Sequence, residues 1–227
     1  MRETPIVTRQ TLGDQTRDVI LERILSGVYK QGDRLVESQI AKELQISQSP
    51  VREALRDLTA MRFVELEPFK GARVRRISLG EIAQIYPVRA ALEELAGQLA
   101  APHLKGNVEA LEEIYRQMHQ AAELENVQEF ARLDARFHRT IVRASNNPFL
   151  AGAWESLLIE SWTYFTALRI IVADIGLMPV VKMHRPLLEA LGAGDAEGAS
   201  MKMKSHISDF AGMLEKNFIN DAAFDGH

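Results

Sequence analysis

Hydrophobic residues near the start of the chain recur at the three- and four-residue spacing of short α-helices. Residues 15–26 and 38–46 each place their apolar side chains on one face, and a Gly-Asp turn lies between them. A third helix is predicted to follow Ser47, a typical N-cap residue, with Pro50 in its first turn. Two short helices joined by a tight turn, the second opening with polar residues, predict a helix-turn-helix.

The hydrophobic period shortens to two between Phe63 and Ile77. The segment FVELEPFKGARVRRI alternates apolar and polar residues around a Pro-Phe-Lys-Gly turn, which predicts a β-hairpin. Together with the helices before it, the hairpin predicts a winged helix-turn-helix in residues 14–78. We expect residues 1–13 to form a flexible N-terminal arm.

From residue 79 onward the pattern is helical. Because proline lacks an amide hydrogen, we expect Pro87 to begin a new helix rather than to continue one. Residues 79–217 therefore predict an all-α bundle of six or seven helices, followed by a flexible tail of residues 218–227, in a chain whose fold class is mainly α. The predicted helices span residues 81–85, 87–101, 108–123, 127–145, 148–171, 178–193 and 196–217.

Composition narrows the class of protein. The chain has 227 residues, no cysteine and a formal net charge of -4, so disulfides and thiolate chemistry are excluded. No apolar run is long enough to cross a bilayer and no N-terminal signal core is present, so we expect a cytoplasmic protein without membrane contact. Residues 1–78 hold 14 lysines and arginines against 11 acids, whereas the remainder is acidic, which hints at an anionic partner for the first unit.

The start of the third helix carries the groups that double-stranded DNA would meet. Ser47, Gln48, Ser49 and the helix N-terminus can contact phosphates or base edges, and Arg52 lies one turn further on. The alternative is that Ser47 only caps its helix and that Arg52 pairs with a neighbouring acid, Glu53 or Asp57. The order of helices and basic hairpin favours DNA binding. The remaining candidate DNA contacts are Ser38, Lys70, Gly71 and Arg73.

The run from Ile24 to Val74, with PVREAL at its core, resembles the N-terminal domain of GntR-family transcription regulators. The similarity covers nearly all of residues 14–78. Many members have arginine where this chain has Gln48. Because glutamine pairs with adenine and arginine with guanine, the resemblance implies an operator that differs from the commonest family pattern.

Four polar residues of the second unit form a candidate metal site. Asp134 and His138 are four residues apart, so they share one face of a helix, and His184 and His206 are on two other predicted helices. Three imidazoles and a carboxylate could bind a divalent metal in the bundle core. Zinc is our first choice, and nickel, manganese or iron are alternatives. Taken alone, the Asp-x3-His pair is equally explained by an intrahelical contact.

The segments IYPVRAALEELAGQLAA, DARFH with NNPFL, and HRPLLEAL resemble the FCD effector domain of the FadR-like branch of that family. Asp134, His138, His184 and His206 match the FCD metal set. The resemblance implies that a small carboxylate effector fills open positions on the metal and that Arg89 helps to hold it. A salt bridge from Arg89 to Glu93 is the alternative. Asn146 could face the same cavity or cap the next helix.

The resulting hypothesis is a ligand-responsive transcription regulator, a repressor that acts as a homodimer on a short pseudo-palindromic operator. Dimerism is implied by the resemblance and by two-fold operator logic rather than by any single motif. Two alternatives stay open at this point. One is a metal-dependent enzyme acting on a small acid, and the other is a regulator with a purely structural metal.

Overall fold

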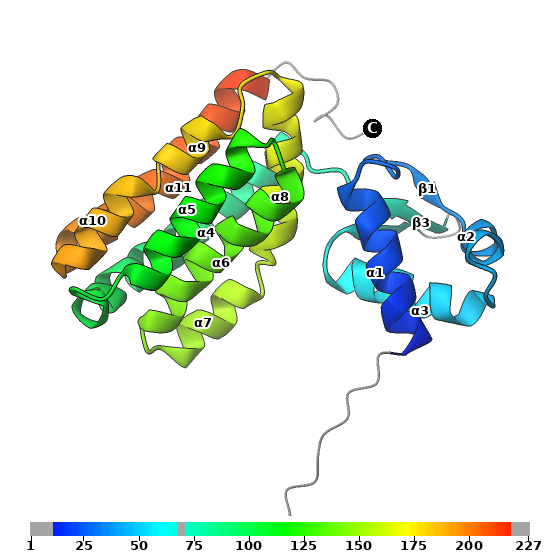
Figure 1. Cartoon of the computed structure of the whole chain (residues 1–227), viewed down its shortest axis with the longest axis horizontal. Helices are drawn as coiled ribbons and strands as arrows, with labels where there is room; N and C mark the ends of the chain where they lie inside the picture. The colour runs from blue at the N-terminus through cyan, green and yellow to red at the C-terminus, as the bar shows by residue number, and fades with distance from the viewer. Residues whose placement is uncertain (1–10, 68–70, 219–227) are drawn as a thin grey trace, which may run out of the picture. The chain divides into compact units, whose positions relative to one another are not determined.

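The computed structural model describes residues 11–67 and 71–218. It divides into two compact units, Met1–Arg75 and Arg76–His227, and each is described by itself. Figure 1 shows the small mixed unit and the helical unit. None of the helices in these residues is long and apolar enough to span a membrane.

The first unit contains three helices and a small antiparallel sheet of strand order β1-β3-β2. Helices α1 and α3 pack against each other, and α2 packs on α3 (Figure 1). This arrangement is the predicted winged helix-turn-helix. The elements are α1 (Leu12–Leu25), β1 (Arg34–Leu35), α2 (Glu37–Leu44), α3 (Gln48–Ala60), β2 (Val64–Glu67) and β3 (Gly71–Val74).

Two local features of this unit differ from the sequence prediction. Helix α1 begins earlier than expected, because Thr11 and Asp14 form a capping box, so residues 11–13 do not belong to an arm. The turn before α2 contains the two-residue strand β1, whose Leu35 pairs with Ala72 and is buried. A strand this short carries no period that a sequence pattern could reveal.

The second unit is entirely helical in the described residues and contains eight helices, α4 to α11, where six or seven were predicted. Helices α4 and α11 pack along each other, and α6 packs against α4, α5 and α8. The helices are α4 (Leu79–Leu104), α5 (Glu109–Glu123), α6 (Val127–Ala144), α7 (Pro148–Glu155), α8 (Ile159–Val172), α9 (Met178–Lys182), α10 (Arg185–Ala193) and α11 (Ala196–Phe218).

The predicted break at Pro87 is wrong. Helix α4 starts at a capping box between Ser78 and Glu81 and continues through Pro87, whose ring is exposed. An internal proline costs a helix roughly 3 kcal/mol. The buried neighbours Ile82 and Tyr86, which lie on the face that packs against α11, offset that cost. Tertiary packing therefore overrides the local preference for a helix end.

Two other predicted helices are each divided. The 148–171 segment separates into α7 and α8 at Leu158, whose φ of 53° lies in the left-handed region. The 178–193 segment separates into α9 and α10 at His184. This second division matters for the site, because it places the histidine at a helix N-cap inside the bundle rather than on a continuous helix.

Candidate metal centre and DNA-reading helix

Three histidine side chains converge in the core of the second unit. His138 comes from α6, His184 from the α9–α10 junction and His206 from α11, and all three are buried. Nε2 of His138 lies 3.3 Å from Nε2 of His184 and 3.2 Å from Nε2 of His206. The sequence predicted that these three histidines could converge, and the structure places their Nε2 atoms close together although they come from three separate elements.

Asp134 completes the cluster. It lies one helical turn before His138 on α6, and its Oδ1 is 3.1 Å from Nε2 of His184 and 3.9 Å from Nε2 of His138. The hydroxyl of Thr163 on α8 donates to Oδ2 at 3.0 Å. The i,i+4 pair is therefore not a simple intrahelical contact, because the carboxylate is shared with histidines from other elements.

The spacing of these atoms fits a divalent ion. Nitrogens bound to zinc at about 2.0–2.1 Å in tetrahedral geometry are about 3.4 Å apart, which is close to the distances between these Nε2 atoms. The Nδ1 atom of His184 faces the carbonyl oxygen of Val180 at 3.0 Å. An Nδ1–H that donates there leaves the lone pair of Nε2 directed at the cluster, as metal binding requires.

The pKa values of His206 and Asp134 are shifted toward the forms that bind a metal. Burial and the neighbouring imidazoles lower the pKa of His206 well below its ordinary value, so the ring is neutral at neutral pH. Burial alone would raise the pKa of Asp134, but the hydrogen bond from His184 and the surrounding positive groups outweigh it and lower that pKa. A neutral imidazole and an ionised carboxylate are the states that coordinate a metal.

Arg89 on α4 lies beside the cluster, and its guanidinium has contacts with two buried carboxylates. Its Nε donates to Oε1 of Glu93 at 2.8 Å, and both side chains are buried. Its Nη2 is 3.9 Å from Oδ2 of Asp134 and, among the described residues, has no hydrogen-bond partner. The salt bridge offered as an alternative for this arginine therefore exists, and it leaves a donor available for another group.

A small cavity adjoins the cluster on the side of this arginine. Arg89, Asp134 and His206 line it together with Thr163. The remaining lining residues are the apolar Phe130, Val180, Ile207 and Phe210. A cationic donor, metal-ligating atoms and an apolar wall around one cavity are suited to binding a small anion.

Glu93 is a residue of this site that the sequence suggested only as a partner of Arg89. Its Oε1 also accepts a hydrogen bond from Nε1 of Trp154 on α7 at 2.8 Å, and its Oε2 pairs with Nδ1 of His138 at 2.6 Å. Burial would raise its pKa, but the positive charge of Arg89 and the contact with His138 lower it instead. One buried carboxylate thus joins the arginine to a histidine of the cluster.

The structure does not bring Asn146 to this cavity. The residue is exposed, with a φ of 53°, in the turn between α6 and α7. The cap that the sequence assigned to it belongs to Asn147, whose side chain accepts from the amide of Leu150 at 3.1 Å. Asparagine tolerates the left-handed conformation, which explains its place in the turn.

In the first unit, the predicted DNA contacts from α2 and α3 are exposed. Ser47 is the N-cap of α3, but its hydroxyl makes no capping hydrogen bond. Gln48, Ser49 and Arg52 follow on the first turns of the same helix, and Ser38 is exposed at the start of α2. The N-terminus of α3 therefore presents exposed polar groups, as a recognition helix must.

The wing residues differ from one another in their surroundings. Gly71 begins β3 with a φ of +89° and is exposed, so its backbone has the freedom that a tight wing turn needs. Arg73 is instead held within the unit, since its Nη1 donates to the carbonyl of Gly32 at 3.2 Å and its Nε pairs with Glu67. Lys70 lies outside the described residues.

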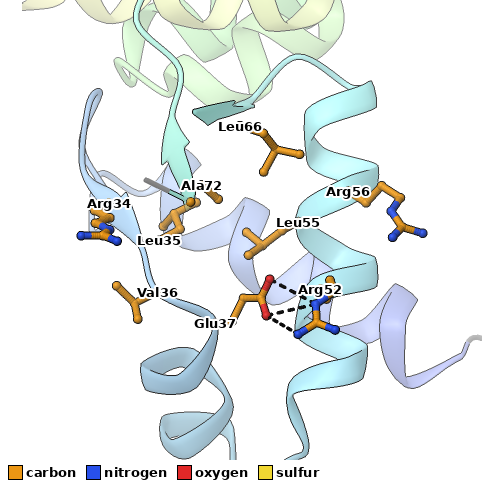
Figure 2. Close-up of a pocket in the computed structure, with 10 residues that line it drawn as sticks. Arg34, Leu35, Val36, Glu37, Arg52, Leu55, Arg56, Leu66 and Ala72 are labelled. Carbon is orange, nitrogen blue, oxygen red and sulfur yellow. Dashed lines mark hydrogen bonds and ion pairs between the residues drawn. The ribbon is translucent and has the colours of Figure 1, made fainter. Parts of the chain in front are cut away.

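Arg52 pairs with neither of the two acids that its own helix offered. Figure 2 shows its guanidinium against the carboxylate of Glu37 from α2. Nη2 lies 2.9 Å from Oε2, and Nε lies 3.3 and 3.2 Å from the two oxygens. The pair lies in a cavity of the first unit that Arg34 and Arg56 also line.

A winged helix-turn-helix followed by a helical unit is the architecture of a DNA-binding transcription regulator. The chain belongs to the GntR family. The model for bacterial regulatory proteins of the gntR family matches residues 12–74, and the FCD domain model matches residues 84–209. FCD domains commonly bind metal ions.

Relatives and solved structures agree with this assignment. The chain is 36% identical to a probable D-xylose utilization operon transcriptional repressor of Paenarthrobacter nicotinovorans, over 90% of this chain and 89% of that protein. It is 36% identical to the gluconate operon transcriptional repressor of Bacillus subtilis over 60% of this chain and 56% of that protein. The fold matches E. coli McbR/YncC with a TM-score of 0.71, at 24% identity over 92% and 99% of the two chains. These proteins are regulators rather than enzymes, and so is this chain.

Proposed function

We propose that this regulator is a metal-dependent repressor that senses a small carboxylate in its FCD domain. The observation that carries the proposal is that Asp134 and His206 of the cluster line one small cavity together with Arg89, whose Nη2 has no hydrogen-bond partner among the described residues. A carboxylate there could place one oxygen on the metal and the other against the guanidinium.

The chemistry of the candidate ligand atoms indicates which metal ions the site prefers. Three imidazoles and one carboxylate suit zinc first, with nickel, manganese or iron as alternatives. Nickel, manganese and iron readily take six ligands, and zinc can expand to five, so each leaves room for an effector oxygen beside Asp134 and the histidines. A metal that holds only its four protein ligands would be structural.

The chemical class of the effector follows from the cavity and from the relatives. The cavity is small and combines a fixed positive group with hydroxyl and apolar walls. The two related repressors are named for D-xylose and gluconate utilisation. We therefore propose a sugar acid rather than a neutral sugar, because only an acid could use both the arginine and the metal; the cavity is sized for its carboxylate group and not for the whole molecule.

A seam of apolar side chains on α4 supports a homodimer. Val88 and Leu95 lie seven residues apart on one side of the helix, next to Leu92 and Leu99, which pack partly against the core of the same chain. Val88 and Leu95 are 49% and 41% exposed in the single chain. A second copy would cover them and would present two winged units to two operator half-sites.

The proposal is tested by metal analysis followed by calorimetry. Purified protein should contain about one divalent ion per chain, and aldonic acids should bind the wild type but not Asp134→Ala. A bound acid should also change operator affinity by a coupling free energy of about 1–3 kcal/mol. Metal that is present while acid binding survives the substitution would make the metal structural. Protein purified without metal that also takes up none would refute the proposal.

A further inference from the structure

The pairing of Glu37 with Arg52 fixes the direction of a side chain at the start of the recognition helix. The two residues are 15 positions apart and belong to the two helices of the helix-turn-helix. As Figure 2 shows, the carboxylate lies against one edge of the guanidinium, in contact with Nε and Nη2. A lone arginine on a helix surface would instead sample many rotamers.

Stability does not account for this contact. The side chain of Arg52 is 58% exposed and that of Glu37 is 35% exposed. Exposed ion pairs contribute little to folding, because water and salt screen them. The core of the first unit is already built from buried apolar residues such as Val51, Leu55 and Leu58. The consequence of the pair is therefore orientation.

The geometry leaves the outer edge of the guanidinium available. Glu37 engages Nε and one hydrogen of Nη2, so both hydrogens of Nη1 and the second hydrogen of Nη2 remain. Two parallel N–H groups on that edge match O6 and N7 of guanine in the major groove. A phosphate can accept hydrogen bonds from an arginine in many orientations, whereas a guanine edge requires two parallel N–H groups in a fixed orientation.

We propose that Glu37 is a positioning residue that holds Arg52 for guanine and sets base specificity without touching the base. Its negative charge acts in the same direction, because it disfavours phosphates near this arginine. The neighbouring Arg34 and Arg56 line the same cavity and carry the charge for general attraction to DNA. The proposal rests on the assignment of Arg52 to the DNA interface.

The test compares specific with nonspecific binding by the full-length protein. An operator is first selected from a random duplex library with the wild type. Gel shifts at one salt concentration then measure Glu37→Gln, Arg52→Ala and the control Glu43→Gln on that operator, on single-guanine substitutions and on a scrambled duplex. Glu43 is the matched control, because it is on the same helix and also pairs with an arginine, Arg23.

Glu37→Gln should weaken operator binding by about tenfold or more, the scale of one bidentate base contact. Binding to the scrambled duplex should stay equal or rise. The penalty for replacing one particular guanine should disappear in Glu37→Gln and in Arg52→Ala alike, while Glu43→Gln should behave as the wild type.

Three results would overturn the proposal. Operator and scrambled duplex could both be bound more tightly, in which case Glu37 only competes with DNA. Both could be bound more weakly, which would mean a structural role. Glu37→Gln could also match the wild type. If Arg52→Ala binds the operator as tightly as the wild type does, then Arg52 is not part of the DNA interface, and the assignment on which this proposal rests is refuted.

Discussion

The substitution Glu93→Gln separates the role of this carboxylate in metal binding from its role in packing. In the wild type, Oε2 of Glu93 lies 2.6 Å from Nδ1 of His138, and a carboxylate at that distance favours the tautomer with its proton on Nδ1. The lone pair of Nε2 then points at the other two histidines. A carboxylate behind a histidine ligand is a common way of fixing the tautomer that binds a metal.

The glutamine can preserve two contacts but not the third. Its oxygen can still accept from Nε of Arg89 and from Nε1 of Trp154, which both lie 2.8 Å from Oε1. The amide nitrogen then faces Nδ1 of His138 with donor against donor. The ring relieves this clash by moving its proton to Nε2, and that tautomer cannot bind a metal through Nε2, the atom that faces the cluster.

The expected loss of metal affinity is therefore at the upper end of the range for such outer contacts, about 100-fold, or roughly 2.7 kcal/mol. The assay is a competition titration of metal-free protein with Zn²⁺ against a chromophoric chelator. Circular dichroism of the same samples verifies that the variant is folded, which matters because Arg89 loses its counter-charge.

The matched control is Glu94→Gln, one position further along α4. Glu94 pairs with Lys204 at the surface and has no contact with the cluster, so its replacement should leave zinc affinity unchanged. If folded Glu93→Gln binds zinc within about twofold of the wild type, the tautomer of His138 is not set by this carboxylate and the reasoning fails.

Four other predictions are accessible with the same protein. Arg52→Ala should abolish specific operator binding in a gel shift while leaving the metal content unchanged. Removal of the metal by a chelator should lower the melting temperature, and zinc at 100 times its Kd should restore about 2.7 kcal/mol. Gly97→Ala should destabilise the protein by about 1–3 kcal/mol in chemical unfolding, because the new methyl would lie 2.7 Å from Met203 and 2.8 Å from the carbonyl of Ala199. Leu95→Glu should convert the proposed dimer to a monomer in analytical ultracentrifugation, and an unchanged sedimentation coefficient would rule out the α4 seam.

Much of the fold could be predicted because local patterns and the family motif agreed. The period of the apolar residues located the helices of both units, and the change to period two located the wing. The errors arose where distant contacts decide the outcome. Pro87 stays inside α4 because its buried neighbours pack on α11, and no residue close to it in sequence reports that packing.

The candidate site was predictable for its ligands but not for the groups that hold them. Asp134 and His138 share a helix face, so spacing alone placed them together. Glu93 gains its importance from His138 and from Trp154, which lies 61 positions away on another helix. The Glu37–Arg52 pair also joins two helices. Carboxylates on helices are usually solvated, so only the folded structure distinguishes these two from the others.

Helix α4 links the proposed sensor to the proposed dimer seam through one rigid element. Arg89 and Glu93 lie buried on the face toward the cluster, while Val88 and Leu95 are exposed on the same helix. A ligand can shift an equilibrium only by the difference in its affinity for the two states. An acid bound by Arg89 gains that difference if the position of α4 distinguishes the states, because the guanidinium moves with the helix. The same movement would reposition Val88 and Leu95 against a second copy. Substitutions in the seam that preserve the dimer should therefore alter the coupling between acid and operator without altering the metal site.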